Sequence, residues 1–98
     1  MDSTTRKLSI RVAGNTITPC LQVIAAKGYQ ISHYFDSDNP NLPFWDAEKD
    51  GRAFSADSAE SLLGLIAMWE QRGDDWHIKP GESELLDRLL SNDATTDV

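Results

Sequence analysis

The chain has 98 residues, of which 40% are hydrophobic and 26% charged; this composition suits one globular domain with one modest core and excludes disorder over its middle. Its formal net charge of -7 opposes binding to nucleic-acid phosphates and to anionic lipid headgroups, because both require Lys and Arg on the protein. The single cysteine, Cys20, excludes an intramolecular disulfide, and there is no apolar leader or long hydrophobic span. We therefore expect a cytoplasmic protein that binds neither nucleic acid nor membranes.

The ends of the chain are polar and lack any apolar periodicity. Residues 1–6 and 91–98 are therefore predicted to be disordered tails on either side of a single domain at residues 7–90. The first predicted element is a strand over residues 7–12, in which alternate side chains are apolar.

A helix ending near Lys27 is expected next. Thr18 offers an N-cap hydroxyl, and Pro19 suits the first helical position. The preceding residues 14–17 contain Gly14-Asn15, a pair that also favours a hairpin turn. Both interpretations of residues 14–17 remain open from the sequence.

A second strand is expected over residues 29–35, which are rich in aromatic and β-branched residues. Turn-forming residues follow, and Pro43 marks the earliest start of the next strand. The turn Asp50-Gly51 then predicts a hairpin whose register places three pairs on one face: Lys49 with Arg52, Ala47 with Phe54, and Trp45 with Ala56.

A long helix follows the hairpin directly. Asp57 is its predicted N-cap, Glu60 stands in the capping-box position, and Gly73 ends it. Gly64 costs this helix roughly 1 kcal/mol relative to alanine, which suggests the close approach of another backbone. The apolar stripe expected to pack on the sheet consists of Ala59, Leu62, Leu63, Ile66 and Trp69.

A short final helix is expected to end near residue 90. It is too short to be stable alone in water, so its stripe must dock on the core, on a second copy or on a partner. The stripe is made of Leu85, Leu86, Leu89 and Leu90. The complete pattern predicts an α+β fold in the order β-α-β-β-β-α-α, with a three- to four-stranded antiparallel sheet and helices packed mainly on one face.

No motif for catalysis, cofactor binding or metal binding stands out. The hairpin has the spacing of a calcium loop, but the residues before it favour a strand where an EF-hand has a helix; that spacing falls on Asp46, Glu48, Asp50, Gly51 and Asp57. His33 and His77 are not spaced as ligands on one helical turn. No nucleophile elbow or phosphate loop occurs. We therefore predict a non-enzymatic protein without cofactor or metal.

The strand face turned away from the predicted core, together with the turn beside it, combines aromatic rings with carboxylates, a pattern that favours binding of a basic protein. The candidate partner-binding residues are Tyr34, Asp36, Asp38, Phe44, Asp46 and Glu48. The predicted function is a small acidic protein-interaction module in a compact bacterial domain, of the inhibitor or immunity type. One alternative is a homodimeric structural or accessory protein joined through the leucine stripe or through a sheet edge. A lower-ranked alternative is a small enzyme or metal-binding domain that uses His33 or His77 with nearby carboxylates.

Overall fold

The computed structural model describes residues 7–95, with the side chains of residues 36, 39, 42 and 92–95 left out. Its elements follow in the order α1 (Ile17–Ala26), β1 (Gln30–Asp36), β2 (Asn39–Lys49), β3 (Arg52–Ala56), α2 (Ala59–Arg72) and α3 (Ser83–Thr95). The predicted α+β class and the order of these six elements are confirmed.

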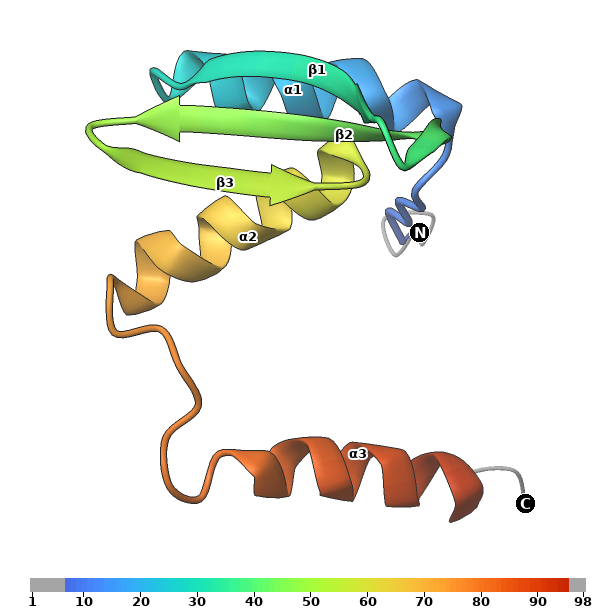
Figure 1. The fold of residues 1–98 in the computed structure, drawn as a ribbon. Coiled ribbons are helices and arrows are strands. Elements are labelled where there is room, and N and C mark those ends of the chain that lie inside the picture. The colour runs from blue at the N-terminus through green and yellow to red at the C-terminus, as the bar shows by residue number, and fades with distance from the viewer. Residues whose placement is uncertain (1–6, 96–98) are drawn as a thin grey trace.

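The three strands form one antiparallel sheet in the order β1-β2-β3 (Figure 1). Asp50 adopts a positive φ of 53° and Gly51 one of 80°, as a tight hairpin turn between β2 and β3 requires. The predicted hairpin register is confirmed: Lys49 pairs with Arg52, Ala47 with Phe54, and Trp45 with Ala56.

The core lies between one face of this sheet and helices α1 and α2. Its buried members are Ile24 from α1, Tyr29 before β1, Ala47 from β2, and Leu62 and Ile66 from α2. The sheet residues packed against them define what we call the inner face: Ile31, Trp45, Phe54 and Ala56. The prediction that helices pack mainly on one face is therefore confirmed for α1 and α2.

The predicted strand over residues 7–12 is wrong. These residues carry no regular secondary structure, and the exposed fractions of Leu8, Ile10 and Val12 lie between 70% and 82%. Alternation shows that a segment can form a strand, but a strand also needs a neighbour, and none of the strands in the described part of the chain pairs with this segment. The hairpin interpretation of residues 14–17 is also wrong, because a 3₁₀ turn, η2 (Gly14–Thr16), leads into α1.

The start of α2 differs from the prediction. Its N-cap is Ser58, not Asp57, and the Ser58 side chain accepts a hydrogen bond from the backbone N–H of Ser61 at 3.0 Å. Glu60 instead accepts a hydrogen bond from the Thr16 hydroxyl at 2.6 Å, which lowers the pKa of its carboxyl. A Cβ added at Gly64 would meet nothing within 4 Å, so the predicted close approach of a backbone there is wrong.

Strand β2 begins at Asn39, four residues before the predicted earliest start at Pro43. Strand β3 pairs with β2 only from Trp45 to Lys49, so the first part of β2 has a single neighbour, β1. Proline is tolerated there because its missing N–H can face the side without a partner strand.

Helix α3 stands apart from the rest of the molecule (Figure 1). It runs to Thr95, so residues 91–95 are helical and not part of the predicted tail, while residues 1–6 and 96–98 lie outside the described residues. Its four leucines are each 52% to 59% exposed. The radius of gyration is 17.6 Å, whereas a compact chain of this length has about 12–13 Å.

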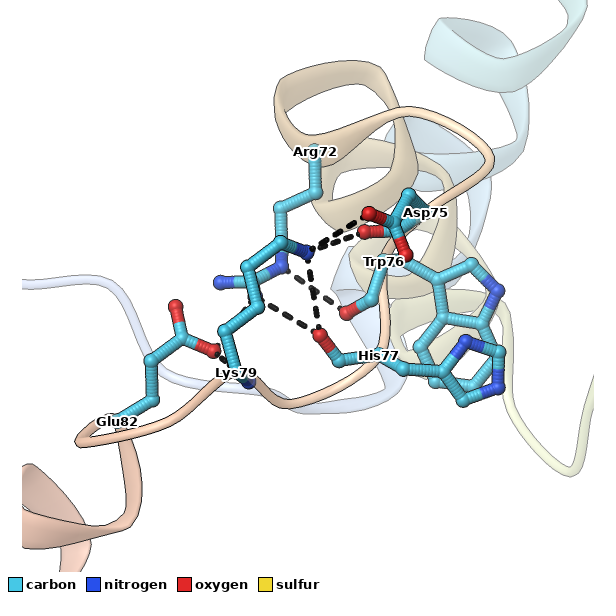
Figure 2. A network of polar contacts seen from close by, with 6 residues as sticks. All are labelled: Arg72, Asp75, Trp76, His77, Lys79 and Glu82. Carbon is cyan, nitrogen blue, oxygen red and sulfur yellow. Dashed lines mark hydrogen bonds and ion pairs between the residues drawn. The ribbon is translucent and has the colours of Figure 1, made fainter.

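A network of polar contacts, which we call the linker clamp, holds the chain between α2 and α3 (Figure 2). Arg72 donates to the backbone oxygens of Trp76 at 3.0 Å and His77 at 3.2 Å, and it forms an ion pair with Glu82 at 2.7 Å. Lys79 donates through its backbone N–H to Glu82 and through Nζ to the backbone oxygen of Asp75. The clamp therefore sets the direction in which α3 leaves the domain.

Candidate functional site

The outer face of the sheet, opposite the core, is the candidate site. Antiparallel pairing brings together on it every second residue of the three strands. Its described members are Gln30, Ser32 and Tyr34 from β1, Phe44, Asp46 and Glu48 from β2, and Ala53 and Ser55 from β3. Neither α1 nor α2 covers it, since both pack on the inner face.

Two aromatic rings form one end of the outer face. Tyr34 and Phe44 are cross-strand partners, and their rings stack with centroids 5.8 Å apart and planes at 23°. Tyr34 remains 43% exposed. Stacking across the strands fixes both rings, so their exposed surfaces form a rigid apolar contact area at the edge of the site.

Two carboxylates lie next along β2. Asp46 stands between Ser32 and Ser55 on the neighbouring strands, and the Ser55 hydroxyl donates a hydrogen bond to Asp46 Oδ1. Glu48 is exposed between Gln30 and Ala53. A shallow pocket of about 180 Å³ opens between the carboxylates and the edge of β1, lined by Gln30, Ile31, Ser32, Asp46, Glu48 and Ala53.

The charge of the outer face is negative because the cations of the hairpin lie elsewhere. Lys49 and Arg52 pair on the inner side, where Lys49 donates to the backbone oxygen of Lys27 at 2.6 Å. Arg52 forms an ion pair with Asp74 at 2.5 Å, and this contact holds the pKa of Asp74 well below its usual range. Among the strand residues of the outer face that the structure describes, none is Lys or Arg.

Of the six residues proposed from the sequence, the structure brings four together: Tyr34, Phe44, Asp46 and Glu48. The side chain of Asp36 lies outside the described residues, although its backbone pairs with Asn39. Asp38 lies in the two-residue turn between β1 and β2, outside the strand that carries Asp46 and Glu48.

The sequence did not single out Ser32 and Gln30 as lining residues of this site. The signal for them was the alternation of β1, whose polar positions fall on the same face as Tyr34. The pairing of β1 with β2 was not fixed by a tight turn, so their positions beside Asp46 and Glu48 needed the structure.

The two histidines lie in aromatic surroundings. His33 contacts Phe35 and Trp45, with ring centroids 5.3 Å and 4.3 Å away. His77 stacks on Trp76 at 4.0 Å. Among the side chains that the structure describes, no three from His, Cys, Asp or Glu gather closely enough to hold a metal ion.

Cys20 is the free thiol of α1 and is partly buried. Burial, followed by the nearby charge of Glu60, raises its pKa, which disfavours the reactive thiolate.

Comparison of the chain with protein-family models, with curated proteins and with solved structures gives no significant match. No helix in the described part of the chain is both long and apolar enough to cross a membrane. The case for a function therefore depends on the chemistry of the outer face.

Proposed function

We propose that the protein is a non-enzymatic interaction module that binds a basic protein partner through the outer face of its sheet. The observation that carries this proposal is the grouping of Asp46 and Glu48 beside the stacked rings of Tyr34 and Phe44 on a face that neither α1 nor α2 covers. Aromatic rings supply contact area at interface cores, and acidic groups steer the approach of a basic surface.

An inhibitor or immunity-type role is the form of this function that the chemistry favours. Such a protein blocks a basic target by covering it, and this needs a rigid charged surface but no catalytic group. The antiparallel sheet supplies the rigidity, because Asp46 and Glu48 are both carried on β2, the central strand, where it is paired on both sides. We place this activity in the bacterial cytoplasm, since the lone cysteine suits a reducing compartment.

The test compares two variants that change net charge equally. Asp46→Asn/Glu48→Gln neutralises the outer face, and Glu84→Gln/Asp87→Asn neutralises two carboxylates on α3. Proteins captured by the immobilised wild-type chain from a lysate of its own organism are identified, purified and measured for affinity against all three forms.

The proposal predicts a basic partner whose dissociation constant rises about tenfold or more with Asp46→Asn/Glu48→Gln and stays unchanged with the α3 variant. Binding should also weaken as salt increases, because exposed charges are screened. Equal affinity for both variants, or the absence of any partner that discriminates them, would contradict the proposal.

A further inference from the structure

Residues 7–12, which we call the N-terminal segment, have the pattern of a strand but no strand partner. Leu8, Ile10 and Val12 alternate with Lys7, Ser9 and Arg11, and the exposed fractions of these three apolar residues are between 70% and 82%. A segment of this pattern is stabilised when one side is buried and its backbone is paired.

The outer edge of β3 is an open strand edge with an apolar groove beside it, and it could accept the N-terminal segment. Among the described residues β3 pairs with β2 alone, so its outer edge is open. Beside that edge lies a mainly apolar pocket of about 330 Å³, lined by Ala53, Phe54, Ser55, Leu65, Met68, Trp69 and Trp76. An added strand would pair with β3 and would bury its apolar side chains against α2, which is the binding mode known as β-augmentation.

Charge favours the same arrangement. If Leu8, Ile10 and Val12 face α2, the alternation places Lys7 and Arg11 on the outer face of the sheet. That face carries Asp46 and Glu48 one strand further in, within reach of long basic side chains. The segment therefore matches the groove on its apolar side and the acidic face on its polar side. It leaves Tyr34 and Phe44 uncovered, because they lie beyond the part of β2 that pairs with β3.

The end of the N-terminal segment is held near the start of α2, and this position prevents antiparallel pairing with β3 of the same chain. Ala13 donates its backbone N–H to Thr16 at 3.1 Å, and the Thr16 hydroxyl donates to Glu60 in the first turn of α2, close to where β3 ends. Laid along β3 of its own chain, the segment would have to run parallel to that strand. A segment from a second copy is free to run antiparallel, the slightly more stable pairing.

The exposed apolar side chains of the segment contribute much of the area that a dimer interface needs. At roughly 100 Å² for one fully exposed aliphatic side chain, the three apolar residues of one segment present about 230 Å². Two exchanged segments would bury about 460 Å² of their own apolar surface. Since roughly 60% of an interface is apolar, the two segments account for about 800 Å² of interface, to which the two covered grooves add.

We propose that the protein forms a twofold homodimer in which the N-terminal segment of each copy adds as an antiparallel strand to the edge of β3 in the other. The exchange is reciprocal and closed, so it covers the open edge of β3 in both copies at once. The dimer does not depend on the partner proposed for the outer face, but Lys7 and Arg11 of the exchanged segment would share Asp46 and Glu48 with that partner.

Disulfide trapping tests the pairing directly. In a Cys20→Ser background, Ser9→Cys is combined with either Ala53→Cys or Ser55→Cys, all three positions being on the outer side in the proposed pairing. Mild oxidation of the full chain should link two chains in at least one of these variants and in none of the single-cysteine controls. A disulfide within one chain, or no disulfide in either variant, would overturn the proposal.

The mass in solution tests the interface. The wild-type chain should have the mass of a dimer by light scattering at high concentration. Ile10→Asn should weaken self-association by roughly 100-fold or more, because both copies lose a buried side chain, whereas the neighbouring Ser9→Asn should not. A monomer mass for the wild type rejects the dimer. Loss of the dimer with Leu86→Asn but not with Ile10→Asn assigns the interface to α3 and equally overturns the proposal.

Discussion

Helices α2 and α3 have nearly the same length, 14 and 13 residues, and each carries a stripe of leucine or isoleucine, yet they have opposite surroundings. Leu62 and Ile66 of α2 are fully buried against the sheet, whereas the leucines of α3 are more than half exposed. Apolar periodicity shows that a helix has one face to bury. It does not show whether residues of the same chain bury that face.

The largest expected contrast comes from truncating one apolar side chain in each helix. Ile66→Ala should reduce the free energy of unfolding by about 2–5 kcal/mol, because it removes a fully buried side chain and leaves a cavity. Leu86→Ala should change it by no more than about 0.5 kcal/mol. Urea denaturation of both variants measures the difference, and similar losses would mean that α3 is packed as firmly as α2.

The start of α2 is expected to depend on Ser58. Ser58→Ala should destabilise the protein by about 1 kcal/mol, since the N–H of Ser61 loses its acceptor. Asp57→Ala provides the control and should have a smaller effect, because Asp57 is not the cap. Thermal unfolding ranks the two variants; a larger loss for Asp57→Ala would restore the capping scheme expected from the sequence.

Gly64 offers a stabilising change in α2. Gly64→Ala should raise the free energy of unfolding by up to about 1 kcal/mol, because alanine has the higher helix propensity and its Cβ meets no atom within 4 Å. Gly51→Ala serves as the opposite case, since the same substitution falls on a positive φ of 80° and should destabilise the hairpin. Chemical denaturation measures both signs.

The smallest expected effect concerns the linker clamp that directs α3. The hydrogen bond from Arg72, followed by that from the backbone of Lys79, lowers the pKa of Glu82 to about 2. Because the pKa is lower in the folded protein than in the unfolded chain, the clamp is fully stabilising above about pH 4.5 and weakens as the pH falls through about 2.

Arg72→Met should therefore return the pKa of Glu82 toward its usual value, as followed by NMR of its carboxyl carbon. The matched variant Arg88→Met removes a cation from α3 that is not bonded to Glu82 and should leave this pKa low. Equal titration of Glu82 in all three proteins would exclude the clamp.

Particular residues show why some of the fold could be predicted and some could not. The Asp50-Gly51 turn fixes the β2–β3 register locally, so the pairs from Trp45 to Lys49 and the shared face of Asp46 and Glu48 followed from the sequence. The N-cap did not, because Asp57 and Ser58 are both good caps and only the backbone conformation selects Ser58.

The predicted strand in the N-terminal segment is wrong for a different reason. The residues alternate as a strand requires, but a strand also needs a neighbour, and the sequence of the segment does not specify one. The candidate site was also predictable only in part. Alternation along the strands places the carboxylates and the aromatic rings on one face, whereas the positions of Ser32 and Ser55 beside Asp46 depend on how the strands pair.

Backbone hydrogen exchange at two protein concentrations tests most directly whether the N-terminal segment pairs with a second copy of the chain. Amides of residues 62–66 should be strongly protected at both concentrations, because their burial is internal to the chain. Amides within residues 8–12 should be protected at high concentration and exchange freely after dilution. Free exchange of residues 8–12 at both concentrations, or protection that dilution does not remove, would contradict the account.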